Sequence, residues 1–304
     1  MSKDAAAGRL KTGLIGAGSF AGYHAGKLAS LGQSDFRAVF DPDHARAAAV
    51  ADKYACQVAP SVEALIAEVE ALIIASPATT HYAFALQALE AGCHVYVEKP
   101  LAEYAKDAEA LVRLADEKGL VLQVGHQERF VARALGLFDA PVKPTRIEAV
   151  REGPGSGRGE DVSVTLDLLI HDLDLAIELI GADPVSVTAS GEGDPLNDVV
   201  AEVQFANGAS AWFRSSRRAQ ARARTMRIVY PSGSADVDFV ARTMRDGTGF
   251  GLDPDFAAAV PDPLGASVEA FLMACLGQGD CPSPGAAAAK AVRLANMIDA
   301  AAAA

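Results

Sequence analysis

Three polar residues stand at helical spacing inside an apolar stretch in the second half of the chain. Asp167, His171 and Asp174 follow the spacing i, i+4, i+7, so a helix over residues 165–180 would project all three from one face. Most of the other positions are leucine or isoleucine, which predicts a largely buried helix. Because an unpaired buried polar group costs about 1–3 kcal/mol, this row must meet internal partners or a ligand.

The histidine in this row has the chemistry of a general base. Imidazole titrates near neutral pH, and Asp167 lies one helical turn away, where its carboxylate can orient the ring. We therefore interpret His171 as the group that accepts a substrate proton, with Asp167 in support. Asp174 fits an internal network that ties the helix to a sheet as well as it fits a functional role.

A lysine stands where a parallel sheet binds its ligands. Glu98-Lys99-Pro100 ends the strand predicted over residues 94–98, and open parallel sheets bind ligands outside the carboxyl ends of their strands. Next to another positive charge, a lysine loses part of its proton affinity. It can then exchange a proton with a substrate hydroxyl. The structural alternative is an exposed lysine paired with Glu98. If the reaction were the oxidation of an alcohol, in which the hydroxyl proton is removed as the hydride leaves, Lys99 and His171 would be the two groups suited to that step.

A glycine turn between the first predicted strand and the first predicted helix matches the dinucleotide-binding pattern G-x-G-x-x-G/A. It reads Gly16-Ala17-Gly18-Ser19-Phe20-Ala21. Glycines let backbone N–H groups approach a pyrophosphate, and the helix N-terminus supplies partial positive charge. Asp41 ends the next predicted strand, where a carboxylate would accept hydrogen bonds from ribose hydroxyls and repel a 2'-phosphate, which favours NAD over NADP. The alternative is that both sites are merely turns, with Asp41 preceding Pro42.

The elements that must position these groups form two domains of an α/β protein. Up to about Val124, short β-type runs alternate with helical patterns, which requires crossover helices and a parallel sheet. We predict these strands over residues 10–15, 36–41, 71–76, 94–98 and 120–124. Residues 1–122 are therefore interpreted as a Rossmann dinucleotide-binding domain.

Residues 123–304 have a different pattern and are interpreted as a substrate and oligomerisation domain. Strands over residues 145–151, 185–191, 199–205, 209–214 and 226–230, with little helix between them, predict an α+β domain with a largely antiparallel open sheet. Asn207-Gly208 can take the positive φ angles of a tight hairpin turn between two of these strands. Two further helices are expected over residues 267–276 and 285–302, the last being a candidate to pack back on the first domain.

The charge of the chain opposes two classes of partner. A formal net charge of -12 at pH 7 and a pI near 4.9 repel nucleic-acid backbones and anionic membrane surfaces. The chain carries no targeting pattern and no apolar run near the ~20 residues that span a bilayer, so we expect a cytoplasmic protein. The four cysteines are dispersed without C-x-x-C spacing, so we expect neither a disulfide framework nor a metal site.

Together these motifs resemble the Gfo/Idh/MocA family of sugar and inositol oxidoreductases, over about residues 10–239. The resemblance rests on the glycine turn, Ser76-Pro77 with His81, Glu98-Lys99-Pro100 and Asp167-x3-His171-x2-Asp174. It implies an NAD-dependent dehydrogenase acting on CH–OH groups, with a sheet face that often makes contacts in a homo-oligomer. It also implies that Lys99, His171 and Asp167 handle the substrate. The residues that it implies for NAD binding are Gly16, Gly18, Ser19, Phe20, Asp41, Ser76, Pro77, His81 and Glu98.

A narrower resemblance, to the UDP-N-acetylglucosamine 3-dehydrogenase subgroup, rests on four blocks of sequence. These are Val124-Gly125-His126-Gln127-Glu128-Arg129-Phe130, Asp161-Val162-Ser163-Val164, Asp167 to Asp174, and Phe205-Ala206-Asn207-Gly208 leading to Ser216-Arg217. The resemblance implies oxidation of the sugar 3-hydroxyl, so that an aminotransferase can install the 3-amino group of the diamino sugar in lipid A. It also implies that Arg129 contacts the substrate, for which a helix-surface arginine is the alternative.

Arginines form one basic cluster in this acidic chain. Its members are Arg214, Arg217, Arg218, Arg222, Arg224 and Arg227. Guanidinium groups can grip a diphosphate, because their paired donors match phosphate oxygens. A solvated or subunit-facing sheet edge explains the cluster without a ligand, and we prefer that interpretation.

Two other functions are compatible with the same residues. An inositol or free-sugar dehydrogenase would use Lys99 and His171 in the same way, but only a nucleotide-sugar enzyme should respond to competition by UDP. A catalytically silent NAD-binding regulator is compatible with the fold. The retention of Lys99, Asp167 and His171 argues against that last function.

Replacing His171 by asparagine tests the interpretation of this residue as the base. His171→Asn should reduce turnover by several orders of magnitude, because the substrate hydroxyl loses its proton acceptor, while NAD affinity stays intact. Steady-state kinetics and an NAD titration measure the two quantities. An unchanged rate would reject the assignment.

Overall fold

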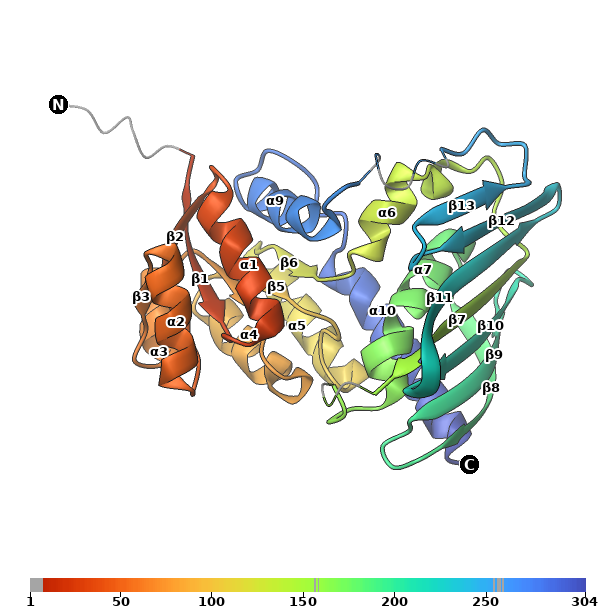
Figure 1. The fold of residues 1–304 in the computed structure, drawn as a ribbon, viewed down its shortest axis with the longest axis horizontal. Helices are drawn as coiled ribbons and strands as arrows, with labels where there is room; N and C mark the ends of the chain where they lie inside the picture. The colour runs from red at the N-terminus through yellow and green to blue at the C-terminus, as the bar shows by residue number, and fades with distance from the viewer. Residues whose placement is uncertain (1–7, 156, 158, 254, 256–257, 259) are drawn as a thin grey trace. The chain divides into compact units, whose positions relative to one another are not determined.

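Six parallel strands in the order β3-β2-β1-β4-β5-β6 form the sheet of the N-terminal half of the chain (Figure 1). The computed structural model describes residues 8–155, 157, 159–253, 255, 258 and 260–304. The strands are β1 (Leu10–Ile15), β2 (Ser34–Phe40), β3 (Gln57–Val58), β4 (Ala71–Ile74), β5 (His94–Val97) and β6 (Leu122–Val124). This order is that of a Rossmann sheet, which confirms the predicted fold. The strand β3 has no predicted counterpart, because two residues show no periodicity.

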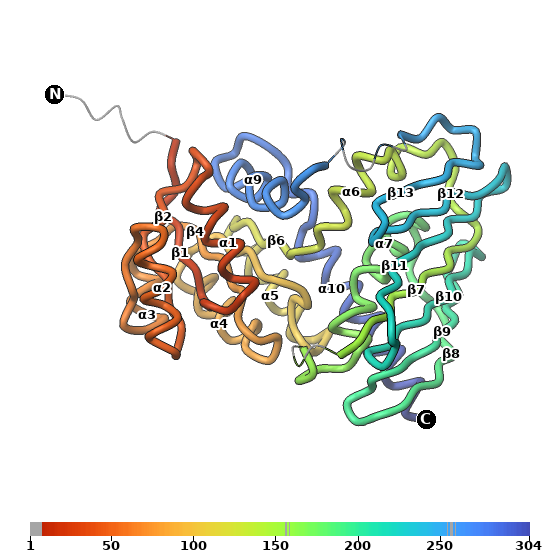
Figure 2. Tube along the Cα trace, viewed as in Figure 1, coloured from red at the N-terminus to blue at the C-terminus, as the bar shows by residue number. Residues whose placement is uncertain are grey.

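Helices connect these strands and cover the sheet. They are α1 (Ser19–Ser30), α2 (His44–Tyr54), α3 (Val62–Glu68), α4 (His81–Glu90) and α5 (Ala105–Lys118), joined late in the sequence by α9 (Pro263–Cys275). On one face, Leu14, Ile73 and Tyr96 pack against apolar residues of α1, α2 and α9. Figure 2 shows α9 beside α1, although the two helices are far apart in the sequence. Among the described residues, no helix combines the length and the apolar composition that a membrane span requires.

The chain divides into two units, and neither is continuous in sequence. The first comprises the described residues up to Ala102, Lys106–Gly125 and Leu264–Ala286, and the second comprises Glu103–Ala105, His126–Pro263 and Ala287–Ala304. This differs from the predicted division at residue 122, since β6 and the segment around α9 belong to the first unit. The helix that returns to the first unit is α9, whereas most of α10 (Gly285–Ala302), for which we predicted such a return, belongs to the second. The physical reason is that the apolar residues of α9 complete the core of the first sheet.

Seven strands in the order β13-β12-β11-β7-β10-β9-β8 form the second sheet. They are β7 (Arg146–Pro154), β8 (Pro184–Glu192), β9 (Asp198–Phe205), β10 (Ser210–Ser216), β11 (Arg218–Tyr230), β12 (Gly233–Asp238) and β13 (Thr243–Asp246). Neighbouring strands are antiparallel except β7 and β10, which are parallel, so the largely antiparallel sheet is confirmed. The short, polar β12 and β13 were not among the predicted strands.

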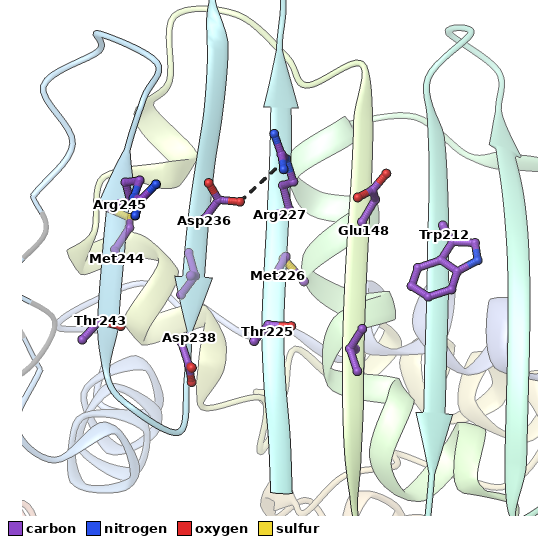
Figure 3. Close-up of a pocket in the computed structure, with 12 residues that line it drawn as sticks. Glu148, Trp212, Thr225, Met226, Arg227, Asp236, Asp238, Thr243, Met244 and Arg245 are labelled. Carbon is purple, nitrogen blue, oxygen red and sulfur yellow. Dashed lines mark ion pairs between the residues drawn. The ribbon is translucent and has the colours of Figure 1, made fainter.

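The two faces of this second sheet differ. Along β7, the buried residues Ile147, Ala149 and Arg151 alternate with half-buried ones. Figure 1 shows α7 (Ile170–Ile180) and α10 against one face of the sheet. The opposite face carries charged and polar side chains and contains a groove of about 740 Å³, whose lining includes Glu148, Trp212, Arg227, Asp236 and Arg245 (Figure 3).

The helix predicted over residues 165–180 changes its geometry near its start. Thr165–Leu169 form a π-helical turn, and α7 begins at Ile170. A π-helical turn contains more residues than an α-helical turn, so the spacing argument for a regular helix does not hold between Asp167 and His171.

The hairpin at Asn207-Gly208 joins β9 to β10, as predicted, but with a different turn. Gly208 has φ +85°, whereas Asn207 is not among the residues with positive φ. Gly208 N–H donates to Phe205 O and Phe205 N–H donates to Ala209 O, both at 2.9 Å, so the loop contains three residues with glycine in the left-handed region. Asn207 acts instead through its side chain, whose Oδ1 accepts from Ala209 N–H at 3.2 Å.

Candidate functional site

The glycine turn of the first unit requires glycine at its first position. Gly16 has φ +104°, and a Cβ built on it would lie 2.6 Å from the carbonyl oxygen of Ala75. At Gly18, a built Cβ meets no described atom within 4 Å, so the space beside the turn is open. Gly18 is also the N-cap of α1, and it has no side chain that could accept hydrogen bonds from the first backbone N–H groups of the helix. Ser19 and Phe20, which follow it, are exposed. Open space beside such amides fits the pyrophosphate of NAD.

Asp41 lies directly against this turn. Its Oδ2 accepts from Ala17 N–H at 2.7 Å, and its Oδ1 accepts from Asp43 N–H at 2.8 Å. These bonds fix the carboxylate just after β2, where such folds bind the adenosine ribose. The residues present therefore fit NAD, and the ribose contact itself stays a prediction.

Glu98 is buried inside the first unit, with 7% of its surface exposed. Its Oε1 lies 2.7 Å from Nε2 of His24, a fully buried residue of α1. Gly125 encloses the carboxylate from another side, since a Cβ built there would lie 2.7–2.8 Å from the carboxylate atoms. The pair ties the helix of the glycine turn to the end of β5, next to Lys99. Sequence reasoning missed His24, because nothing local indicates a partner 74 residues away.

His81 joins the loops that follow β4 and β5. Its Nδ1 lies 2.7 Å from Pro100 O and its Nε2 lies 2.9 Å from Ser76 O, with the residue 1% exposed. Burial lowers the pKa of His81, although both carbonyl contacts oppose that change. Pro77 precedes a short helical turn over residues 78–80, and Lys99 is half-buried before a cis bond to Pro100. The contacts predicted between these residues and NAD stay predictions.

In the second unit, ionisable side chains surround His171. Glu128, the first residue of α6 (Glu128–Ala134), has its Oε2 2.7 Å from Nδ1 of His171. Its Oε1 accepts from Nη1 of Arg151 at 3.1 Å. Arg151 also donates from Nε and Nη2 to the carboxylate of Asp172, at 2.7 and 3.1 Å. Residues from α6, β7 and α7 thus form one buried network.

The charges in this network keep Glu128 ionised. Burial opposes ionisation, but His171 and Arg151 outweigh it and lower the pKa of Glu128 well below 4.5. Burial also disfavours the Arg151 cation, yet Asp172 and Glu128 raise the pKa of Arg151 above its ordinary value. The group that faces Nδ1 of His171 is therefore a carboxylate at neutral pH, and the role of His171 as a base stays a prediction.

Sequence reasoning assigned the orientation of His171 to Asp167 and missed Glu128. The Oδ2 atom of Asp167 lies 3.6 Å from Nη2 of Arg217, and a Cβ built on Gly159 would lie 2.6 Å from its carboxylate. Glu128 stands in the block over residues 124–130, from which only Arg129 was singled out. A catalytic role for Asp167 stays a prediction.

The predicted substrate contact Arg129 is buried, with 5% of its surface exposed. Its Nε and Nη2 donate to Asp174 at 2.6 and 2.8 Å, and its Nη1 lies 3.1 Å from Glu178. The Arg129–Asp174 pair joins α6 to α7. Asp174 therefore belongs to an internal network, which was one of the two roles expected for it. The alternative of a helix-surface arginine is wrong, because the guanidinium is enclosed by its partners. Substrate contact by Arg129 stays a prediction.

Comparison with known families matches each half of the chain. The GFO/IDH/MocA oxidoreductase family with an NAD-binding Rossmann fold matches residues 10–126, and the GFO/IDH/MocA C-terminal domain matches residues 148–236.

Individual relatives extend this similarity over most of the chain. UDP-N-acetylglucosamine 3-dehydrogenase of Acidithiobacillus ferrooxidans is 38% identical over 278 residues, which cover 87% of this chain and 88% of that protein. Its solved structure matches with a TM-score of 0.88 at 36% identity, covering 96% of this chain and 97% of that one. Inositol 2-dehydrogenase of Rhizobium meliloti is 28% identical over 230 residues, 69% of each protein.

Adding a methyl group at Gly125 tests the enclosure of Glu98. Gly125→Ala should lower the free energy of unfolding by about 1–3 kcal/mol, because the new Cβ would meet the Glu98 carboxylate at 2.7–2.8 Å and displace it from His24. Denaturant unfolding monitored by circular dichroism measures the change.

Gly22→Ala is the matched control for that substitution. Gly22 lies within α1, and a Cβ built on it meets no described atom within 4 Å. Its replacement should leave the stability unchanged or raise it by about 0.5–1 kcal/mol, owing to the higher helix propensity of alanine. If Gly125→Ala proved as stable as the wild type, the carboxylate would have room to move and the enclosure would not hold it.

Proposed function

We propose that this chain, which belongs to the Gfo/Idh/MocA family of NAD-binding oxidoreductases, oxidises the 3-hydroxyl of UDP-N-acetylglucosamine with NAD as the hydride acceptor. The observation that carries the catalytic part of the proposal is the Glu128–His171 pair, an imidazole whose Nδ1 faces an ionised carboxylate at 2.7 Å. The choice of substrate is supported by the relative of Acidithiobacillus ferrooxidans, whose name describes that activity.

His171 is the base in this proposal. With Nδ1 facing Glu128, the hydroxyl proton goes to Nε2, and the carboxylate stabilises the imidazolium that forms. Lys99, which follows β5, donates a hydrogen bond to the substrate oxygen and stabilises the negative charge that develops on it. Loss of the proton from the 3-hydroxyl oxygen to His171, and of a hydride from C3 with NAD as its acceptor, would give a 3-keto sugar.

The residues of the first unit hold the cofactor. In this proposal the amides of the glycine turn and the start of α1 bind the pyrophosphate, and Asp41 accepts from the ribose hydroxyls. The Glu98–His24 pair positions α1 relative to the end of β5, and so acts on both the glycine turn and Lys99.

We also propose that the protein acts in the cytoplasm as a homo-oligomer, through the groove face of the second sheet. This face carries the acids Glu148 and Asp236 together with Arg227 and Arg245 (Figure 3). Two copies that meet through a surface bearing both signs can pair opposite charges around a two-fold axis. Trp212 adds a large aromatic surface of the kind enriched at interfaces.

Formation of NADH tests the proposed substrate. Protein supplied with NAD and UDP-N-acetylglucosamine should produce NADH absorbance, and more of it when an aminotransferase consumes the keto product. Free N-acetylglucosamine is the matched control, since it has the same ring without the nucleotide.

Two outcomes would count against the substrate. Binding of NAD without turnover of any UDP-sugar, even with the coupled aminotransferase, contradicts the proposal. Oxidation of myo-inositol that UDP does not inhibit would reassign the protein to the inositol dehydrogenases, one of which is 28% identical to it.

Glu128→Gln removes the charge beside Nδ1 of His171 and keeps an oxygen that can accept a hydrogen bond. The kcat should fall by about 10- to 1,000-fold, because the imidazolium loses its anionic partner. The acid limb of kcat/KM should also move to lower pH, because the carboxylate favours the protonated ring in the wild type. Steady-state rates from about pH 5 to about pH 9 measure both effects.

Glu178→Gln makes the same chemical change at a carboxylate of α7 that is 45% exposed and pairs with Arg129. It should leave both the rate and the acid limb as they are in the wild type. If Glu128→Gln lowered the rate without moving the limb, the carboxylate would serve packing alone.

A further inference from the structure

The basic cluster of the second unit separates into arginines with partners and arginines without them. Arg214 pairs with Glu152, Arg218 with Glu192 and Asp198, and Arg227 with Asp236. Arg217 is 7% exposed and donates from Nη2 to the carbonyls of Gly159 and Val162, both at 2.7 Å. For these four, the interpretation of a charge-balanced sheet edge or an internal bond is sufficient.

Arg222 and Arg224 differ from the other four. Within the described part of the chain, neither guanidinium forms a hydrogen bond or an ion pair. Arg224 is half-buried and Arg222 is exposed. Within the described residues, these two cations therefore lack the direct partners that the other four arginines of the cluster have.

The register of β11 places both side chains on the helix-covered face of the sheet. Arg224 is paired across the strands with the buried Arg151 of β7, and the Cγ of Arg222 lies 3.3 Å from a Cβ built on Gly153. Thr225 and Arg227, their neighbours along β11, line the groove on the opposite face (Figure 3). Arg222 and Arg224 thus share the face that carries the network around His171.

Two other cations and two carboxylates act on the Arg224 cation. Burial lowers the pKa of Arg224, and repulsion from Arg151 and Arg222 lowers it further. Glu128 and Asp172 attract the cation, but their carboxylates already accept from Arg151. An anion with several oxygens that entered here would relieve the repulsion and supply the acceptors that both guanidinium groups need.

We propose that Arg222 and Arg224 bind the diphosphate of the nucleotide-sugar substrate, an inference that rests on the proposed function. In such a substrate the diphosphate is attached to C1 of the sugar, two ring carbons from the 3-hydroxyl that His171 deprotonates. Arg224 is paired across the strands with Arg151, which donates to Glu128, so a diphosphate site here would neighbour the Glu128–His171 pair and suit the dimensions of the molecule. Free sugars and inositols carry no such anion, so these arginines select for the nucleotide-linked form.

Binding of UDP, which carries the diphosphate without the sugar, tests the proposal directly. Arg224→Gln and Arg222→Gln should each weaken UDP binding by about 10- to 100-fold in calorimetry and raise the KM for UDP-N-acetylglucosamine by a similar factor, with kcat nearly unchanged. NAD affinity should stay at the wild-type value, which distinguishes the substrate diphosphate from that of the cofactor. The melting temperature of Arg224→Gln should not fall, because the substitution removes a cation that its neighbours repel.

Arg227→Gln is the matched control, an arginine of the same strand on the groove face that pairs with Asp236. It should leave UDP affinity unchanged. Wild-type UDP affinity in both Arg222→Gln and Arg224→Gln, or an equal loss in the control, overturns the proposal, as does a loss of NAD affinity that matches the loss for UDP. If Arg224→Gln fails to fold, the UDP affinity of Arg222→Gln still tests the proposal, because Arg222 is exposed.

The wild-type enzyme separates failure of this inference from failure of the proposed function. Turnover of UDP-N-acetylglucosamine by the wild type, with unchanged KM in both variants, overturns the arginine site alone. Absence of UDP binding and of UDP-sugar turnover in the wild type overturns both.

Discussion

The site in the second unit depends on how the charge of one buried arginine is compensated. Arg151 is 1% exposed, and a guanidinium removed from water costs several kcal/mol unless partners replace the water. Asp172 replaces it with two hydrogen bonds and Glu128 with a third. These bonds fix α6 and α7 on β7, and they hold the Glu128 carboxylate where it meets His171. The orientation of the imidazole is therefore a consequence of neutralising a buried charge on the neighbouring strand.

The parts of the fold that local sequence determines are the parts that could be predicted. β1 and α10 occupy the predicted residues, because the glycine turn that follows β1 marks its end and the long alanine-rich run of α10 favours a helix. β3, β12 and β13 are too short or too polar to show such a pattern. The π-helical turn at Thr165–Leu169 could not be predicted, since it reflects how that segment packs and not its composition. The same is true of the return of α9 to the first core.

The candidate site divides in the same way. Gly16 and Lys99 could be recognised because a turn or a strand end within a few residues determines their position. His24 and Glu128 could not, because each finds its partner through the tertiary fold, Glu98 being 74 residues from His24. The position of Arg151 in the sequence does indicate a buried ion pair. It follows Ile147 and Ala149 on the inward side of a predicted strand, and a cation at an inward position requires a carboxylate nearby.

The contribution of α9 has a consequence for how the protein folds during synthesis. The ribosome completes all six strands of the first sheet early, and α1 and α2 cover part of one face, but the part of that face beside Tyr96 lacks its cover until Phe271 and Leu272 of α9 have been made. For most of translation this nascent sheet displays apolar surface that chaperones or other nascent chains can bind. A premature stop shortly before Pro263 would therefore damage the N-terminal fold more than the position of the missing residues suggests.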